Sequence, residues 1–256
     1  MIDPRAIVDP GAEIGKGVEI GPFAVIGAGV TIGAGSWIGP HAVVKGPTTL
    51  GRETKVFQFA SIGDAPQDRK YAGEPTRLVV GDRNVFREFC SINRGTAGGR
   101  GETRIGNDCL FMAYSHVAHD CIVGSHCIMS NCTALAGHVE LGDWVILSGY
   151  AGIHQFCKVG AHAFLANNAA VTRDVPPYLL VAGSPAEPKG VNSEGLKRRG
   201  FDAAQIANIK NAYRIFYRKG RKLAEATEQL RALAPSQPEI APFVDFLAAS
   251  ERSIIR

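Results

Sequence analysis

The strongest constraint on the fold of this chain is an apolar residue at every sixth position. All positions in this phase from Ile2 through Ile62 are aliphatic. After a first break the phase resumes from Val80 to Ile92, and after a second it runs from Ile105 to Val171. A period of six belongs neither to a helix nor to one long strand. It is typical of short strands joined by turns, in which three six-residue units complete a coil and the coils stack as parallel strands. The repeat therefore predicts a mainly β fold, a parallel β-helix.

A second set of residues, most of them small, lies two positions before the aliphatic ones. Ala24 and Ala60 are members, and five of the six cysteines share the phase: Cys90, Cys109, Cys121, Cys127 and Cys157. This placement favours buried free thiols in the core, with disulfide, metal-binding or catalytic cysteines as the alternatives. Glycine often follows the aliphatic residue, as at Gly15 and Gly33. We expect it there to supply the corner conformation that other residues reach only with strain.

The two breaks and the end of the repeat define the predicted domain organisation. Residues 63–79 and 93–104 are too polar and glycine-rich for coil walls, so they are predicted to be loops extruded from the β-helix. After the repeat, Asp202 and Gln205 form a capping-box-like helix start, and apolar residues at helical spacing follow. We expect a β-helix domain over 1–189 and a small C-terminal α-helical domain over 190–256.

Charge and composition narrow the possible partners. Residues 190–256 carry 12 Lys/Arg and 7 Asp/Glu, a net +5, whereas residues 1–189 carry 16 and 17, a net −1. The basic excess indicates either an anionic partner or a solvated helix surface. No apolar run approaches the ~20 residues of a membrane span. No signal peptide and no nucleic-acid-binding motif is apparent, so we expect a cytoplasmic protein without nucleic-acid partners.

The histidines are the candidate chemical groups, because six of the seven lie between positions 116 and 162. At one coil of separation, His119, Gly137 and Gln155 fall in one column, which His138 and His154 flank. A histidine beside a carboxylate, as His119 is beside Asp120, is suited to general-base catalysis. A free N–H at Gly137 could stabilise an oxyanion. Exposed histidines without a task and a three-histidine zinc site are the alternatives.

Several stretches carry a family resemblance that spans essentially the whole chain. They are QDRKYAGEP (67–75), SHVAHD (115–120), AGHV (136–139), HQF (154–156) and GVNSEGLKRRGF (190–201). With the repeat, they resemble the UDP-N-acetylglucosamine O-acyltransferases of lipid A biosynthesis. The resemblance implies a left-handed β-helix, a handedness that the period alone does not give. A related N-acyltransferase has an additional N-terminal domain, whereas here the repeat starts at Ile2.

The resemblance also implies a reaction and its participants. An (R)-3-hydroxyacyl group would pass from acyl carrier protein to the glucosamine 3-OH of UDP-N-acetylglucosamine, without a cofactor, a metal or a covalent enzyme intermediate. The enzyme would be a homotrimer with sites between subunits, and its basic tail would receive the acidic carrier protein. His119 would be the general base, Asp120 its orienting carboxylate and Gly137 the oxyanion donor.

The remaining implied site residues bind substrate. The first loop would contact the sugar through Gln67, Asp68 and Lys70. The cleft would be lined by His116, His138, His154 and Gln155. The nucleotide or donor would be held by Asn192, Glu194, Arg198 and Arg199. Asn167 would limit acyl length, and it predicts a shorter chain than that used by members with glycine there.

One departure from the family concerns the acceptor. Asn93 stands where many members have histidine, so a 3-amino analogue of the sugar nucleotide is an alternative acceptor. The sequence is also compatible with a transferase using acetyl-CoA, with a zinc enzyme like γ-carbonic anhydrase, or with a non-catalytic β-helix.

Overall fold

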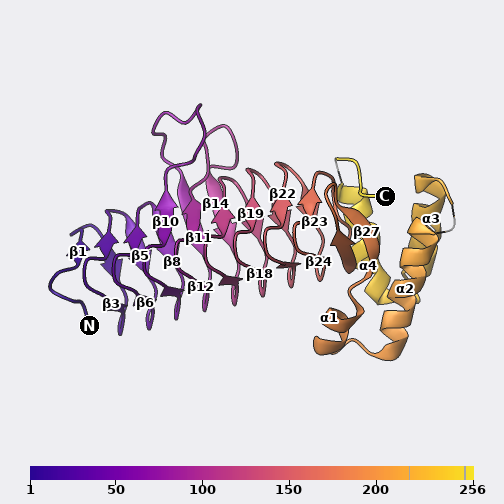
Figure 1. Cartoon of the computed structure of the whole chain (residues 1–256), viewed down its shortest axis with the longest axis horizontal. Coiled ribbons are helices and arrows are strands. Elements are labelled where there is room, and N and C mark those ends of the chain that lie inside the picture. The colour runs from indigo at the N-terminus through magenta and orange to yellow at the C-terminus, as the bar shows by residue number, and fades with distance from the viewer. Residues whose placement is uncertain (219, 251) are drawn as a thin grey trace.

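The computed structural model describes residues 1–218, 220–250 and 252–256. Figure 1 shows a long stack of short strands that runs from the N-terminal end of the molecule to a group of helices. The strands form three parallel sheets, one for each side of the coil. The predicted parallel β-helix is therefore confirmed.

The strands of each sheet follow one another at intervals of three along the chain. The first sheet contains β1 (Ile7–Val8), β4 (Val25–Ile26), β7 (Val43–Val44), β10 (Ser61–Asp64), β13 (Ser91–Asn93), β16 (His116–Val117), β19 (Ala134–Leu135), β22 (Gly152–Ile153) and β25 (Ala170–Val171). The second contains β2 (Glu13–Ile14), β5 (Val30–Ile32), β8 (Thr48–Leu50), β11 (Arg77–Val80), β14 (Glu102–Ile105), β17 (Ile122–Val123), β20 (Glu140–Leu141) and β23 (Lys158–Val159). The third contains β3 (Glu19–Ile20), β6 (Trp37–Ile38), β9 (Lys55–Val56), β12 (Val85–Phe86), β15 (Leu110–Phe111), β18 (Ile128–Met129), β21 (Ile146–Leu147), β24 (Phe164–Leu165), β26 (Leu179–Ala182) and, antiparallel to it, β27 (Glu187–Val191).

The strand register shows where the two loops leave the coils. Ile7 pairs with Val25 and His116 with Ala134, each 18 residues on. Ser61 instead pairs with Ser91, and Ser91 with His116, so 12 and 7 residues are inserted. The extruded segments are shorter than predicted, 65–76 and 94–101, because β10 and β13 include the first residues of the two predicted loops and β11 and β14 the last. Figure 1 shows both rising from the same edge of the stack, the edge between the first and second sheets.

The six-residue phase marks the core, as predicted. Its apolar side chains are buried from Ile20 to Val171, whereas Ile2, Val8 and Ile14, at the open N-terminal end, are partly exposed. The five cysteines of the second phase are buried free thiols. Phe86 and Phe111 stack in the interior with ring centroids 4.8 Å apart. Each fully buried side chain of this size contributes about 1.5–3 kcal/mol, so the stack of coils is the main source of stability.

The expectation for the glycines after the aliphatic residues is wrong for most of them. Gly15 and Gly33 do not have positive φ, and the corner residue that does lies two positions later, at Gly17 (φ 75°) and Gly35 (φ 71°). The glycines are needed because the next coil approaches closely. A Cβ on Gly33 would lie 2.5 Å from the backbone N of Arg52, a distance that no side chain tolerates.

The C-terminal part of the chain is helical. It contains α1 (Ser193–Arg198), α2 (Ala203–Tyr217), α3 (Leu223–Leu233), the short 3-10 turn η1 (Pro238–Ile240) and α4 (Ala241–Ala249). The predicted capping box is present, because Asp202 and Gln205 bond reciprocally at the start of α2. Helix α1 was not predicted, and β27 crosses the expected domain boundary at 189/190. None of the helices in the described ranges has both the length and the apolar character needed to cross a bilayer.

The end of the chain returns to the β-helix at Asp174, which is fully buried. The carboxylate of Asp174 accepts hydrogen bonds from the Lys158 N–H (2.8 Å) and the Ser250 hydroxyl (2.6 Å). Its backbone bridges Ile254. Figure 1 places the C-terminus beside the last coils. The last residues are thereby fixed close to the turns that follow β22 and β23.

Candidate active site

The predicted column of His119, Gly137 and Gln155 forms at the edge between the first and second sheets. Stacked turns build it, since the His138 N–H donates to the His119 carbonyl (3.0 Å) and the Phe156 N–H to the Gly137 carbonyl (3.1 Å). Gly137 lies directly on the imidazole of His119, because a Cβ at position 137 would be 2.6 Å from Cε1 and 2.8 Å from Nε2. Among the described residues, the Gly137 N–H donates to no backbone or side-chain acceptor. A donor is therefore available beside the His119 ring.

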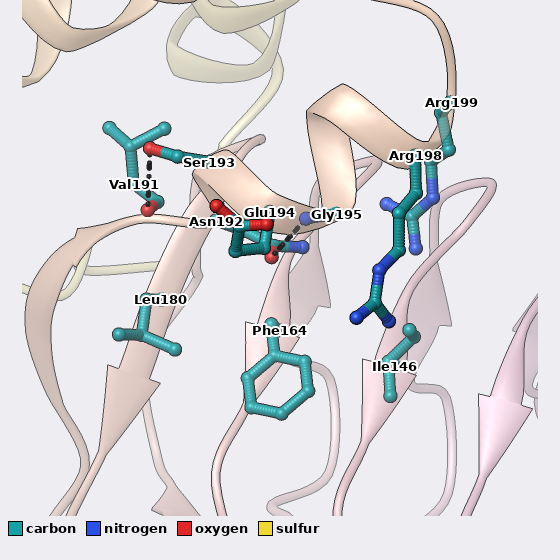
Figure 2. Close-up of a pocket in the computed structure, with 10 residues that line it drawn as sticks. All are labelled: Ile146, Phe164, Leu180, Val191, Asn192, Ser193, Glu194, Gly195, Arg198 and Arg199. Carbon is teal, nitrogen blue, oxygen red and sulfur yellow. Dashed lines mark hydrogen bonds between the residues drawn. The ribbon is translucent and has the colours of Figure 1, made fainter.

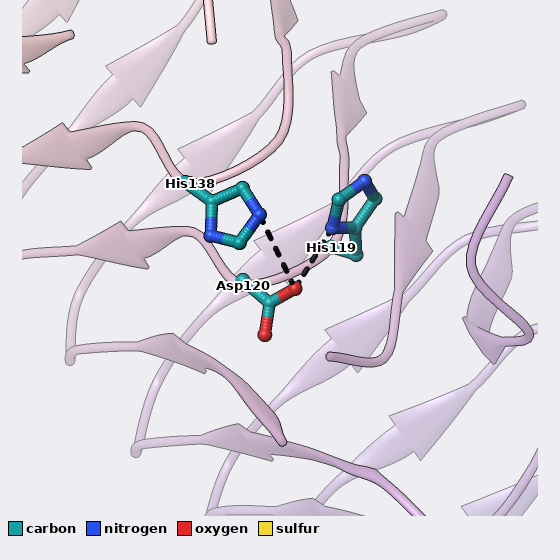
Figure 3. A group of neighbouring side chains, drawn as sticks. All are labelled: His119, Asp120 and His138. Atoms are coloured by element: carbon teal, nitrogen blue, oxygen red, sulfur yellow. Dashed lines mark hydrogen bonds and ion pairs between the residues drawn. The ribbon is translucent and has the colours of Figure 1, made fainter. Parts of the chain in front are cut away.

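His119 and Asp120 form a hydrogen-bonded pair, which Figure 3 shows with His138. The His119 Nδ1 lies 2.8 Å from the Asp120 Oδ2. A carboxylate at Nδ1 favours the tautomer with the proton on Nδ1, and this leaves Nε2 unprotonated. The His119 side chain is partly accessible, whereas that of Asp120 is fully buried. The pair has the geometry of a general base with an orienting carboxylate.

The second loop holds Asp120 in place. The Thr96 hydroxyl donates to Asp120 Oδ2 (2.6 Å), the Thr96 N–H lies 3.1 Å from both oxygens, and the Arg100 N–H donates to Oδ1 (2.8 Å). Burial acts to raise the pKa of Asp120, but the hydrogen bonds from Thr96 and His119 outweigh it and lower the pKa below the usual value. Asp120 is therefore a fixed negative charge against His119. Sequence reasoning did not identify Thr96 or Arg100, because they belong to an inserted loop without periodicity.

His138 completes this group from the next coil. Its Nε2 lies 3.8 Å from Asp120 Oδ2, and its ring meets that of His119 edge-on at 5.2 Å. The ring also stacks on Phe156, with centroids 4.4 Å apart. Burial lowers the pKa of His138, and the nearby carboxylates of Asp120 and Asp68 only partly oppose this. His138 is therefore biased toward the neutral form, able to accept or donate a single hydrogen bond.

The first loop brings further predicted residues to the same edge. Gln67 and Lys70 are exposed, and Asp68 is partly buried, its Oδ1 accepting from the Lys70 N–H (3.0 Å). Asn93 lies beneath this loop, nearly fully buried, with its Nδ2 donating to the Ala65 carbonyl (3.0 Å). Asn93 therefore supports the loop from below and does not reach the surface that Asp68 and Lys70 form.

An apolar groove runs along the outer face of the first sheet, next to the column. It encloses about 440 Å³, and its walls include His116, Ala134, Gly152, His154 and Ala170. The Nδ1 of His116 is hydrogen-bonded to the Ser91 hydroxyl (2.7 Å). Asn167 is exposed in the turn between β24 and β25, where the strand that contributes Ala170 begins. The groove suits an alkyl chain whose reacting end lies near His119.

A separate cavity of about 380 Å³ lies between α1 and the third sheet, and Figure 2 shows its walls. It brings together the predicted Asn192, Glu194, Arg198 and Arg199 with apolar side chains such as Phe164. Asn192 has a structural task, because its Oδ1 caps α1 at the Gly195 N–H (3.1 Å) and its Nδ2 donates to the His162 carbonyl (2.9 Å). Arg199 lies over the Trp144 ring at 5.2 Å. In a single chain this cavity is on a different face from His119.

One group of three possible metal ligands occurs among the described residues, namely His119, Asp120 and His138. The oxygens of Asp120 already accept four hydrogen bonds from Thr96, Arg100 and His119. The Nδ1 of His119 is engaged with the same carboxylate. These donors fit a hydrogen-bonded acid–base pair and do not match the three-histidine zinc site considered from the sequence.

The fold and this site together define a hexapeptide-repeat transferase. The six-repeat bacterial transferase hexapeptide family matches residues 102–137, and a family described as UDP N-acetylglucosamine O-acyltransferase, domain 2, matches residues 174–255. A relative from Thiobacillus denitrificans, acyl-[acyl-carrier-protein]–UDP-N-acetylglucosamine O-acyltransferase, is 54% identical over 100% of this chain and 99% of its own. The chain belongs to the UDP-N-acetylglucosamine O-acyltransferase family and is an acyltransferase.

Solved structures agree over the whole length. The UDP-N-acetylglucosamine acyltransferase of Francisella novicida has a TM-score of 0.98 at 43% identity, covering 100% of this chain and 94% of that one. The Acinetobacter baumannii structure gives 0.97 at 43% identity, covering 100% and 99%. These matches bear out the left-handed β-helix with a small helical C-terminal region. They give no support to the 3-amino acceptor or to the carbonic-anhydrase hypothesis.

Proposed function

We propose that this enzyme transfers an (R)-3-hydroxyacyl group from acyl carrier protein to the 3-OH of UDP-N-acetylglucosamine, the first step of lipid A biosynthesis. One observation carries the proposed chemistry: Asp120 holds Nδ1 of His119, while Gly137, whose N–H has no acceptor among the described residues, lies against the ring near Nε2. This arrangement can remove a hydroxyl proton and stabilise an oxyanion at neighbouring positions. The donor is already an activated thioester, so the reaction needs no enzyme nucleophile.

In this mechanism His119 Nε2 takes the proton of the sugar hydroxyl as its oxygen attacks the thioester carbonyl. The carbonyl π electrons move onto oxygen, and the Gly137 N–H stabilises the developing charge. Collapse of the tetrahedral intermediate breaks the C–S bond, and the imidazolium of His119 returns the proton to the leaving thiolate. Asp120 stabilises the imidazolium throughout without becoming protonated. No cofactor takes part in this proposed step. That the enzyme needs none remains a prediction.

The predicted binding residues divide between the two loops, the groove and α1. We propose that Gln67, Asp68 and Lys70 bind the sugar together with His138 and Gln155. The apolar groove with His116 and His154 takes the acyl chain. Glu194, Arg198 and Arg199 hold the nucleotide, positioned by the cap that Asn192 places on α1. Asn167 limits the chain length.

We propose a homotrimer with sites between subunits, and the positions of these groups support it. The α1 cavity and His119 lie on different faces of one chain, so one sugar nucleotide contacts both only if a neighbour supplies α1. An exposed aromatic ridge offers a contact surface: Phe23, His41, Phe59, Phe89 and Tyr114 stack at centroid spacings from 4.8 to 5.4 Å. Exposed apolar surface of this extent is typical of an interface. We propose that the ridge packs between subunits, in a cytoplasmic enzyme whose basic helical region receives the carrier protein.

The test incubates metal-stripped enzyme with UDP-N-acetylglucosamine and a series of (R)-3-hydroxyacyl carrier proteins, with products read by mass spectrometry. We expect O-acylated sugar nucleotide, and a longer preferred chain in the Asn167→Gly variant. His119→Ala should abolish transfer while light scattering still reports three chains. Near-normal turnover by the His119→Ala variant would contradict the role of His119 as general base. Exclusive use of the 3-amino nucleotide would contradict UDP-N-acetylglucosamine as the acceptor.

A further inference from the structure

A second cavity adjoins the catalytic column on the side opposite the acyl groove. It encloses about 260 Å³ and lies where the second sheet meets the returning C-terminal tail. His138 and Phe156 form its rim toward the column, and Arg100, Lys158 and Arg252 line its wall together with Glu140 and Asp174. Three cations from distant parts of the chain therefore converge next to the reaction centre.

The two acids of this cavity are already engaged. Asp174 is fully buried, and its oxygens accept from Lys158 N and Ser250 Oγ. Glu140 forms an ion pair with Arg100. Lys158 and Arg252 have only backbone partners, since Lys158 Nζ donates to the Ala249 carbonyl (3.2 Å) and Arg252 to the Gln155 carbonyl. Within the described ranges, neither cation lies in an ion pair. With Glu140 paired to Arg100, Asp174 is the one remaining acid in the lining against these two cations, so the cavity beside the active site carries a net positive charge.

The position of the cavity indicates which anion it suits. In the proposed reaction the acyl chain lies in the groove of the first sheet and the thioester carbonyl at Gly137. The rest of the donor must then leave the column, and this cavity is open space on the other side, directly against His138. The arm that carries the thioester in acyl carrier protein has a phosphodiester at its protein end. Arginine and lysine are the usual partners of phosphate oxygens.

We propose that Lys158 and Arg252 bind the phosphate of the donor's prosthetic arm, so that the cavity is the site where the arm enters the active centre. Arg100 links this site to the catalytic pair, because its backbone holds Asp120 while its side chain lines the cavity. The proposal rests on the proposed donor. It adds a binding site that uses Arg252, which the packing of the C-terminal tail places beside Gln155 of the column.

The test compares two small donors that differ only in phosphate. A 3-hydroxyacyl thioester of phosphopantetheine and the same thioester of pantetheine are assayed with UDP-N-acetylglucosamine, using the acyl length that the wild-type enzyme prefers. The variants are Lys158→Met and Arg252→Gln, and the matched control is Lys55→Met, an exposed lysine on the third sheet. We expect the wild type and the control to favour the phosphorylated donor in kcat/KM. Each variant should lose about tenfold of that preference, as expected for one charge-assisted contact.

The phosphate-free donor separates binding from structural damage. If either substitution merely loosened the tail, both donors would slow equally and the preference would persist, which would overturn the proposal. A rise in KM for the sugar nucleotide with an unchanged donor preference would also overturn it, because the cations would then serve the acceptor diphosphate. If the wild type turns over neither small donor, the result contradicts the proposed function itself, because the enzyme would then not use a thioester of this arm as its donor.

Discussion

Gly137 is in van der Waals contact with the imidazole of His119, and no other residue fits at position 137 without moving that ring. A Cβ there would be 2.6 Å from Cε1 of His119. The contact explains how a β-helix sets the orientation of a catalytic base. Asp120, in the same coil as His119, binds Nδ1 of the ring, and Gly137 in the next coil packs against the ring near Nε2.

We therefore expect Gly137→Ala to lower kcat/KM by about 100-fold or more, because a displacement of this size misaligns both His119 and the neighbouring N–H. The measurement is steady-state transfer, with the melting temperature as a check on folding. Gly27→Ala is the control, since its added Cβ would meet Lys45 Cα at an ordinary 3.5 Å. Equal activity of the two variants would show that the contact with His119 is unimportant.

The second loop offers a sharper comparison between two adjacent glycines. A Cβ on Gly99 would be 2.5 Å from the Asp120 carboxylate, whereas one on Gly98 would meet nothing within 4 Å. Both substitutions restrict the unfolded chain alike, so their difference reports the folded site. Gly99→Ala should lower kcat by about tenfold or more, because the shift of Asp120 disturbs the tautomer and the orientation of His119. Gly98→Ala should match the wild type. An equal loss of kcat in the two variants would show that the effect comes from the loop as a whole and not from the contact with Asp120.

The pKa of Asp120 predicts a pH dependence of stability. The hydrogen bonds to its carboxylate outweigh the effect of burial, so its pKa in the folded protein is below the 3.8 expected for the unfolded chain. Such a group stabilises the fold fully at pH values above 3.8, and this contribution is lost as the pH falls through the folded value. The free-energy difference of unfolding between wild type and Asp120→Asn should be largest near neutral pH and shrink below about pH 4. Chemical denaturation across that range measures it, and a difference that grows on acidification would contradict the assignment.

The six-residue phase predicted the coils and the column because both depend on one local regularity. Once a residue's place in the coil is known, the residue 18 positions later is its neighbour, so His119 and Gly137 could be paired without coordinates. The same logic explains the buried cysteines. It could not explain the glycines correctly, since the close approach of the next coil is visible only between coils.

The missed residues lie outside the repeat. Thr96 reaches Asp120 across an inserted loop of no fixed period, and Arg252 reaches the column from the end of the chain. Their positions follow from long-range packing, and no periodic pattern in the sequence indicates which residues such packing brings together. The resemblance implies that Asn192 binds substrate, and the structure shows in addition that Asn192 caps α1.

This role makes Asn192 the subject of a final prediction. Asn192→Asp keeps an oxygen that accepts from the Gly195 N–H and loses the donor to the His162 carbonyl, whereas Asn192→Ala loses both. Loss of a helix cap costs about 1 kcal/mol, so the alanine variant should melt at a lower temperature. Because α1 ends at Arg198 and Arg199 is its C-cap, the same variant should raise the KM for the sugar nucleotide with little change in kcat. Asn192→Asp should recover most of both effects if the cap is what positions the arginines. If instead the amide itself binds substrate, both variants should raise KM alike, and the melting temperature would not follow KM.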